Sequence, residues 1–483
     1  MSNINLKNKT ITGMIWSAVQ KFGCAILSFA TNIILARLLT PEDFGCIGLL
    51  SIFILISQVF IDGGFGDALV QKDKTNQRDY STIFFWNILV SLIIYSILFI
   101  SAPYISDFYK IEKLTELLRI LGLVLFINAL GFIPRNRLRK RLVFKKLAQA
   151  ELVAAIIATI VAVITAYNGC GVFSLIYFNL SLSVIRSLMS WIFEHWIPSI
   201  TFDVQSFLSL FKYGGYLLIS DLLNTTCDNL QGIIIGKLYN PATMGFYTQA
   251  KKLEEVPSLT LSGIVSQVTF PVFSSIKEDS DKIKTAHRSS FVAIAFVSIP
   301  LMLFLSVTAK PLIVLLYTEK WIESIPYFQI LCMGAAAYCL QSVNYQLFVS
   351  LGYSKTMFNW NLIKRLIAIV LIVIGSFWGI YGLLFSITVN MWVMFVINGL
   401  LAGKKSGYIF SQQFKDIIPI VVVSIVVSFI CLILGYFVSL PNVLLLILLT
   451  ITFLLTYLFL SLIFKLKGFQ ILYSIIIERI KND

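Results

Sequence analysis

The sequence predicts an all-α, polytopic membrane protein with about fourteen transmembrane helices. Of its 483 residues, 58% are hydrophobic and only 13% are charged, whereas soluble domains usually carry about 25% charged residues. Several charge-free segments are long enough to cross a bilayer, and a sequence block that starts at residue 31 recurs at residue 231. We therefore expect two six-helix lobes, related by this internal repeat, and two additional C-terminal helices.

Four segments contain no charged residue and are each long enough to cross a hydrocarbon core of roughly 30 Å as a helix: 81–102, 289–308, 417–438 and 443–464. Less uniform spans are expected at 11–36, 44–70, 115–134, 147–167, 171–193, 212–236, 244–273, 325–349, 357–377 and 379–402. The first span is interpreted as retained rather than as a signal peptide. Trp16, Gln20 and Lys21 interrupt its apolar run, and no A-x-A-like cleavage site follows.

The distribution of basic residues predicts the orientation. An even number of spans places both termini on one side, and 25 of the 38 lysine and arginine residues fall on that side, against seven on the other and six within spans. The positive-inside rule then makes the termini cytoplasmic. The dense run at 135–146 is interpreted as part of this signal, with attraction to anionic headgroups, rather than as a nucleic-acid site, because no nucleic-acid module accompanies it.

The internal repeat predicts the domain organisation. The segment TNIILARLLTPEDFG (31–45) aligns without a gap on QGIIIGKLYNPATMG (231–245), so that Pro41 and Gly45 recur as Pro241 and Gly245. Six spans per repeat give parallel repeats, which is an arrangement of transporter halves around a midplane path. The expected lobes are 1–200 and 201–403, followed by two extra helices and an amphipathic tail in 404–483.

The eighth span contains an unusual cluster of charges. Lys251, Lys252, Glu254 and Glu255 lie within five residues, two to three turns inside the span. One ionisable residue in a span costs about 2.5–3.5 kcal/mol on insertion scales, so the cluster is a candidate functional site. Neutralisation between helical neighbours is the simpler interpretation and stays open. Pro257, one turn later, is expected to kink the helix.

Other spans carry polar stripes at helical spacing. Lys21 lies in line with Ser17, Cys24 and Ser28, and Arg186 lies in line with serines of the sixth span. The seventh span places Asp221 and Asp228 on one face, and the second ends in DGGFGDALVQK (62–72), where Asp62 and Asp67 bracket glycines that permit close helix approach. Lys364 and Arg365 are expected to snorkel to the cytoplasmic interface. Some of these groups would serve only as hydrogen bonds between helices.

No metal or cofactor site is predicted. The seven cysteines show no CxxC spacing, and the two histidines, His195 and His287, are assigned to separate polar connections. The longest outer loops, near 103–114 and 309–324, are too short for the extramembrane domain that a membrane glycosyltransferase or polymerase generally needs.

Three motifs together resemble a known family. The turn RLLTPEDFG (37–45), the segment DGGFGDALVQK (62–72) and the pattern GFYTQAKKLEEVP…FPVFSSIKED (245–279) resemble bacterial polysaccharide flippases of the multidrug/oligosaccharidyl-lipid/polysaccharide exporter superfamily, and most of all the colanic- and teichuronic-acid exporter branch. The resemblance implies a transporter, not an enzyme, that moves an undecaprenyl-pyrophosphate-linked oligosaccharide across the bacterial inner membrane by alternating access. It also implies that Lys251 and Lys252 face the cavity, and that polysaccharide polymerase machinery is a partner.

The chemistry of such a substrate, rather than the resemblance itself, suggests roles for the charged residues. Lys21, Arg186, Lys251 and Lys252 would attract phosphate. The acids that would hold these cations, or bind a coupling proton or sodium ion, are Asp62, Asp221, Asp228, Glu254 and Glu255. A lipid II flippase and a drug/cation antiporter of the same superfamily remain as alternatives, although the extra helices and the lysines inside spans disfavour the antiporter.

Overall fold

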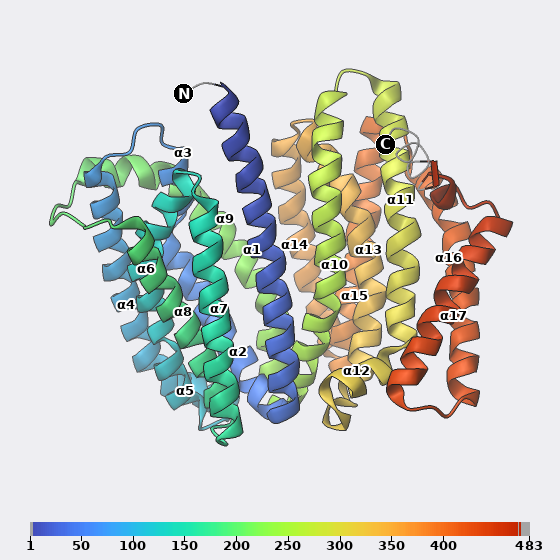
Figure 1. The fold of residues 1–483 in the computed structure, drawn as a ribbon, viewed down its shortest axis with the longest axis horizontal. Helices are drawn as coiled ribbons and strands as arrows, with labels where there is room; N and C mark the ends of the chain where they lie inside the picture. The colour runs from blue at the N-terminus through green and yellow to red at the C-terminus, as the bar shows by residue number, and fades with distance from the viewer. Residues whose placement is uncertain (1–2, 472, 475–483) are drawn as a thin grey trace. The chain divides into compact units, whose positions relative to one another are not determined.

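The structure is a computed structural model that describes the backbone of residues 3–471, 473 and 474, and the side chains of these residues except 3–11, 14 and 354–358. The described residues contain α-helices and one 3-10 turn but no strand, so the expected all-α fold is confirmed (Figure 1). The helices are α1 (Asn3–Leu38), α2 (Pro41–Asp62), α3 (Phe65–Gln71), α4 (Gln77–Tyr109), α5 (Leu114–Leu121), α6 (Leu123–Lys140), α7 (Phe144–Tyr167), α8 (Phe173–Glu194), α9 (Val204–Leu238), α10 (Pro241–Ser275), α11 (Ser280–Val307), α12 (Ala309–Tyr317), α13 (Ser324–Ser350), α14 (Ser354–Ser376), α15 (Gly379–Ser406), α16 (Phe410–Phe437) and α17 (Asn442–Ile463).

Every expected span coincides with a long helix, or with a helix and its short neighbour, in this order along the chain. In the described part of the chain, twelve of these segments are long and apolar enough to cross a membrane. The two that fall short are α9 and α13. α9 carries Lys212, Asp221 and Asp228, whereas α13 packs against α11, α12, α14 and α15 and buries most of its side chains. A helix enclosed by other helices need not be uniformly apolar, because little of its surface meets lipid.

Local capping explains where the helices begin. The Thr40 hydroxyl accepts a bond from the Asp43 backbone N–H at 3.3 Å, and the Asp43 carboxylate accepts the Thr40 N–H at 3.0 Å, with Pro41 at the first helical position. This reciprocal pair is a capping box, which satisfies two otherwise unpaired N–H groups. In the matching turn of the repeat, Asn240 accepts from the Thr243 N–H at 2.8 Å. Both copies of the repeat therefore start a helix with an N-cap side chain, and at Thr40 this cap is reciprocal.

The chain divides into two compact units, Met1–Gly245 and Phe246–Asp483. In the first, α9 packs on α2, α3 and α4, while α7 packs against α1 and α8. This division places α9 in the first unit because α9 packs there. The expected boundaries at 200 and 403 follow the sequence repeat instead and place α9 in the second lobe. The lobes 1–200 and 201–403 and the additional region 404–483 therefore remain a prediction.

Two close backbone contacts in the first unit require glycine. A Cβ atom at Gly45 would lie 1.8 Å from the Pro241 carbonyl oxygen, and one at Gly245 would lie 1.9 Å from that of Pro41. The two matched turns of the repeat thus meet backbone to backbone, which explains why glycine recurs there. Between α2 and α3, Gly64 has φ of 69° and would place a Cβ 2.4 Å from the Gly214 carbonyl oxygen of α9.

In the second unit, α16 and α17 stand beside α11 and α12 (Figure 1). The Tyr457 hydroxyl donates to the Phe296 carbonyl oxygen at 2.9 Å, and the Phe304 and Phe453 ring centroids lie 5.0 Å apart. The two extra helices are therefore packed directly on this unit. The expected amphipathic tail at 467–483 lies in part outside the described residues, at 472 and 475–483.

Candidate functional site

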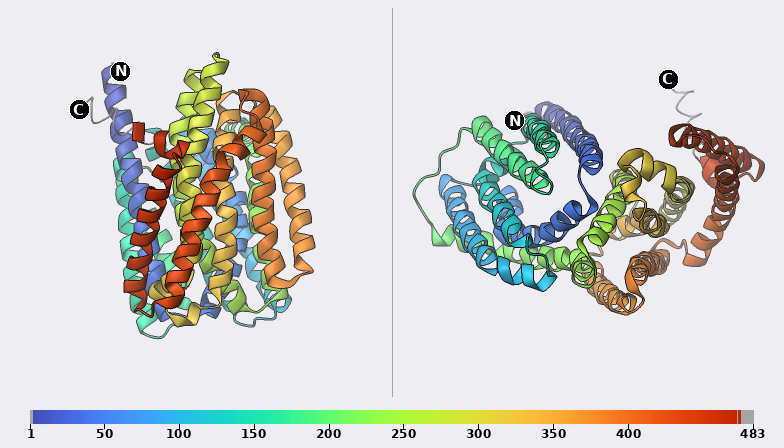
Figure 2. Two further views of the ribbon diagram at one scale, coloured as in Figure 1. Left: turned by 90° about the vertical axis from the view of Figure 1, so that its right-hand side faces the viewer. Right: turned by 90° about the horizontal axis from the view of Figure 1, so that it is seen from below.

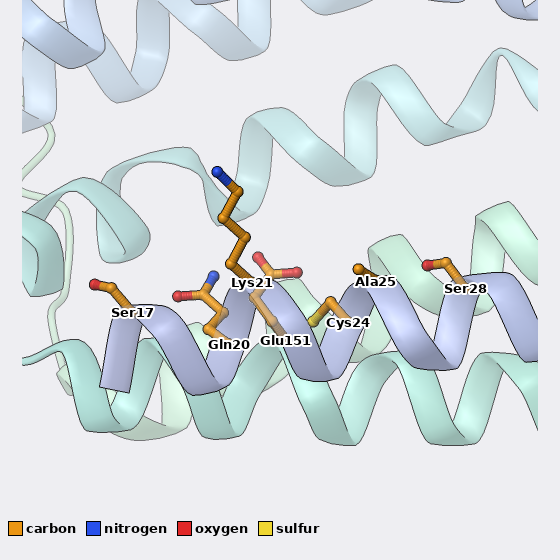
Figure 3. Close-up of a pocket in the computed structure, with 7 residues that line it drawn as sticks. All are labelled: Ser17, Gln20, Lys21, Cys24, Ala25, Ser28 and Glu151. Atoms are coloured by element: carbon orange, nitrogen blue, oxygen red, sulfur yellow. The ribbon is translucent and has the colours of Figure 1, made fainter. Parts of the chain in front are cut away.

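A pocket of about 520 Å³ lies in the first unit, along one face of α1 (Figure 3). Its walls are Ser17, Gln20, Lys21, Cys24, Ala25 and Ser28 of α1 and Glu151 of α7. Spacings of three and four residues bring these α1 side chains to one face. Lys21 is exposed, and its ammonium extends away from α1 (Figure 3). In the view of Figure 3, the Glu151 carboxylate lies near the base of the Lys21 side chain.

The Glu151 carboxylate connects this pocket to Arg186 of α8. One guanidinium nitrogen of Arg186 lies 3.8 Å from Glu151 Oε2, and another donates to Asn128 Oδ1 of α6 at 2.9 Å. Arg186 Nε is buried and has no hydrogen-bond partner. The Arg186 and Glu151 side chains are 20% and 21% exposed, so the pair is partly exposed. Arg186 therefore retains donor capacity that its protein neighbours do not use.

Hydrogen bonds continue this network to the end of α2. Asn128 Nδ2 donates to Gln58 Oε1 at 3.1 Å, and Gln58 Nε2 donates to Asp62 Oδ1 at 2.8 Å. Asp62 also interacts electrostatically with Asp221 of α9 and with Arg135 of α6. We call Gln58, Asp62, Asn128, Glu151 and Arg186 the first-unit network. Residues from α2, α6, α7 and α8 meet in it.

Arg135 is a further charge beside this network. It starts the basic run at 135–146, which the sequence assigns to the cytoplasmic side. In the structure it lies within α6, where it interacts electrostatically with Arg186, Glu151 and Asp62. Sequence reasoning also missed Glu151, although it is the only acidic residue in its expected span, 147–167, and that was a usable signal. Asp228, seven residues beyond Asp221 on α9, is exposed.

The charges at 251–255 interact with one another but differ in how far they are buried. Lys251 Nζ lies 3.8 Å from Glu255 Oε1, and these side chains are 36% and 40% exposed. Glu254 is only 4% exposed and interacts with Ser258 one turn later. Lys252 is exposed. The helix α10 continues through Pro257 to Ser275.

A second network lies in the second unit around Asp416 of α16. Its carboxylate accepts bonds from Arg288 Nε at 2.7 Å, Arg288 Nη2 at 2.9 Å, the Tyr408 hydroxyl at 2.8 Å and Lys467 Nζ at 2.9 Å. Its side chain is 4% exposed. Tyr408 lies in the connection between α15 and α16, where burial, and after it the bond to Asp416, raises the pKa of its hydroxyl well above the usual value.

Two expectations about this unit are wrong. His287 does not lie in a polar connection but is fully buried in α11, with Nδ1 2.8 Å from Ser406 Oγ and Nε2 2.8 Å from Asn344 Oδ1. Lys364 does not snorkel: it is 9% exposed and its ammonium donates to Asn398 Oδ1. Hydropathy alone misplaced both, because it does not show which helix face is turned inward.

Comparison with known proteins identifies the family. Residues 34–326, more than half of the chain, match the family described as "Polysaccharide biosynthesis protein". The chain belongs to this family. It is similar to the teichuronic acid biosynthesis protein TuaB of Bacillus subtilis (strain 168), with 24% identity over 74% of each chain. It is also similar to the lipopolysaccharide biosynthesis protein WzxC of Escherichia coli (strain K12), with 23% identity over 83% of this chain and 81% of that one.

Solved structures show the same fold. The lipid II flippase MurJ in an inward closed conformation aligns with a TM-score of 0.75 at 16% identity, over 93% of this chain and 98% of that one. An inward-facing multidrug resistance MATE family transporter of the MOP superfamily aligns with a TM-score of 0.62 at 14% identity, over 83% and 99%. The family match thus confirms the expected polysaccharide-biosynthesis family, and the solved structures confirm the expected fold.

Proposed function

We propose that the chain is a flippase that moves an anionic, lipid-linked oligosaccharide across the inner membrane of a bacterium, with both termini in the cytoplasm. An undecaprenyl pyrophosphate with a sugar chain cannot cross hydrocarbon unaided, because its charged head would lose its hydration. The head needs a polar, cationic path, whereas the polyprenyl tail can stay in lipid. Two observations support this proposal. The chain belongs to a family of polysaccharide biosynthesis proteins, and lysine and arginine are concentrated in the connections on the side of the termini.

The observation that carries the proposal is the Arg186 guanidinium. It lies beside the pocket that Lys21 lines, it is partly exposed, and its Nε has no partner. Arginine binds phosphate through several parallel N–H donors, so a partly exposed arginine whose carboxylate partner lies as far as 3.8 Å away is suited to a phosphate head. Glu151, at 3.8 Å, lowers the cost of keeping this cation in the membrane while no substrate is bound.

The other charges receive roles within this proposal. Lys251 and Lys252 of α10 are the second group of cations for the substrate. The acids Asp62, Asp221, Asp228, Glu254 and Glu255 balance these cations or bind a coupling proton or sodium ion. Transport follows alternating access of the two lobes, 1–200 and 201–403, with 404–483 as an addition. Polysaccharide polymerase machinery is the proposed consumer of the exported lipid.

A lipid II flippase is the second candidate, favoured by the fold shared with MurJ. Both substrates carry a polyprenyl pyrophosphate, so the cationic site serves either. The accumulated lipid distinguishes them: loss of function would leave a polysaccharide precursor inside the cell in one case and lipid II in the other.

The test is export in the native host. Lys21→Gln and Arg186→Gln are introduced singly and together, membrane levels are checked, and surface polysaccharide and lipid-linked precursor are measured. Arg139→Gln is the matched control, because Arg139 pairs with Asp67 and both side chains are more than half exposed. We expect lost surface glycan and accumulated precursor for the double variant and normal export for the control. Normal export by the double variant at normal protein levels would contradict the site.

A further inference from the structure

The linker between the two repeats, residues 195–203, is tied to the start of α4. Trp196 Nε1 donates to Gln77 Oε1 at 2.7 Å, and Gln77 Nε2 donates back to the Ile197 carbonyl oxygen at 2.6 Å. Further along, the Ser81 and Ser199 hydroxyls lie 2.9 Å apart, and the Asp203 N–H donates to Thr82 Oγ1 at 3.0 Å. These bonds hold the linker backbone alongside the first two turns of α4, where α4 enters the membrane.

Trp196 anchors the linker from the inside. Its side chain is 4% exposed, and its ring lies 5.5 Å from that of Phe84 and 5.8 Å from that of Trp191. At the end of the linker, Asp203 caps α9. The hydroxyl of Ser206, followed by the backbone N–H of Gln205, lowers the pKa of the Asp203 carboxyl below its usual value. The linker is thus fixed at both ends.

This fixed linker directs large apolar side chains outward. Ile197 is 80% exposed, Ile200 95% and Phe202 51%, and the first turns of α9 add Val204 at 58% and Leu208 at 59%. We call these five residues the linker patch. Connecting segments that face water are normally polar, and a contiguous exposed apolar patch marks an interaction surface. Figure 2, in its right-hand view, shows this segment as a loop at the outer edge of the first unit.

Charged neighbours and adjoining helices indicate what covers the patch. Lys74 and Arg78, in the short connection before α4 and at its start, are exposed, and Arg78 interacts electrostatically with Asp203. The candidate membrane span α8 leads into the linker, and Leu188 and Ile192 in its last two turns are 52% and 54% exposed. Apolar side chains next to basic residues at the end of a span match the chemistry of the headgroup boundary.

We infer that the linker patch is a membrane anchor that inserts into the headgroup–acyl boundary of an anionic leaflet, with Arg78 and Lys74 at the lipid phosphates. A protein partner is the weaker alternative, because the linker directly follows a candidate membrane span and exposed basic residues adjoin it. The anchor keeps the beginning of the second repeat attached both to α4 and to the membrane surface. The inference goes beyond the transport function and does not depend on which lipid is moved.

The experiment places an environment-sensitive fluorophore on the patch in the full chain. Cys24, Cys170 and Cys227, the three cysteines that are not buried, are replaced by serine, and Ile200→Cys is labelled. Glu278→Cys, at an exposed position in the connection between α10 and α11 and outside the anchor, is the control. The proteins are reconstituted in vesicles of phosphatidylethanolamine and phosphatidylglycerol, and quenching by doxyl-labelled lipid is compared with quenching by aqueous iodide.

We expect the label at position 200 to emit at shorter wavelength and to be quenched by the doxyl lipid and not by iodide, and the reverse at position 278. Equal iodide quenching at both positions would overturn the inference, because the patch would then face water. Protection of position 200 from both quenchers would also overturn it and would indicate a protein occupant. Replacing phosphatidylglycerol by phosphatidylcholine tests the charge: the depth of the label decreases if Arg78 and Lys74 bind anionic headgroups.

Discussion

The two units contain polar networks that differ in how completely their members are paired. In the second unit, the Asp416 carboxylate is 4% exposed and accepts four hydrogen bonds between 2.7 and 2.9 Å. In the first unit, Arg186 is 20% exposed, makes one bond at 2.9 Å, lies 3.8 Å from its carboxylate and leaves Nε unpaired. One network is closed by its own side chains, whereas the other has capacity left for a ligand.

The difference shows which buried charges to associate with function. A charge in a low-dielectric interior stabilises a fold only when its partners compensate for lost hydration, and the Asp416 network meets that condition. A charge that is kept in a membrane with incomplete pairing incurs a cost that packing does not explain. We therefore assign Asp416 to the architecture of the second unit and Arg186 to transport.

The largest expected effect is the loss of stability caused by replacing Asp416. Asp416→Asn removes the charge that Arg288 and Lys467 share, and breaking a buried pair costs roughly 3–5 kcal/mol. Because both cations are about half exposed, we expect the free energy of unfolding to fall by about 3 kcal/mol, at the lower end of that range. A thermal unfolding series on the purified protein measures it. Asp281→Asn, at an exposed position in the first turn of α11, is the control and should unfold like the wild type.

His287 adjoins the closed network through Ser406, whose hydroxyl oxygen also accepts the Tyr408 N–H at 3.2 Å, and it provides the next test. His287→Phe keeps a ring among the aromatic neighbours but leaves Asn344 Oδ1 without its partner. An unsatisfied buried acceptor costs about 1–3 kcal/mol, so we expect the midpoint of unfolding to fall less than for Asp416→Asn. An unchanged midpoint would show that the closed network does not support the fold as its geometry indicates.

Glu151 tests the open network. Glu151→Gln removes the negative charge 3.8 Å from Arg186, and since the pair is partly exposed we expect less than about 1 kcal/mol of destabilisation. Export should change while stability does not, because Arg186 then binds the anionic head without a competing carboxylate. The rate of surface glycan appearance at matched protein levels measures the effect. Wild-type export would remove Glu151 from the proposed site.

The smallest expected effect belongs to the Arg139–Asp67 pair. Both side chains are more than half exposed, at 52% and 58%, and the pair lies outside either network. Exposed pairs contribute roughly 0.2–1 kcal/mol at most. We expect Arg139→Gln to lower neither the unfolding midpoint nor export beyond the scatter of repeated measurements. A large loss in either would mean that exposure is a poor guide to the role of a charge here.

The helices were predictable because the bilayer imposes a length and an apolar composition on each span. The recurring Pro41–Gly45 and Pro241–Gly245 turns were also visible, since capping and close backbone contact each restrict the residue type locally. Along one helix, the face of α1 that carries Lys21 followed from spacing alone. Sequence reasoning succeeded wherever the constraint acts within a few residues.

The contacts between helices were not predictable in this way. Arg186, Glu151 and Asn128 come from three different helices, and no spacing along the chain brings them together. His287 and Lys364 were misplaced for the same reason: hydropathy locates a span, but packing decides which side chains turn inward. In the 251–255 cluster, the spacing predicted the Lys251–Glu255 pair, but it did not show that Glu254 is buried while its neighbours are exposed or half-buried.

The measurement that tests the central claim most directly compares Arg186→Gln and Asp416→Asn in two assays, unfolding of the purified protein and export of surface glycan in the native host at matched membrane levels. Our account predicts that Arg186→Gln loses export and keeps its stability, whereas Asp416→Asn loses stability first. The opposite pattern, a destabilised Arg186→Gln protein that still exports at the wild-type rate per molecule, would contradict it.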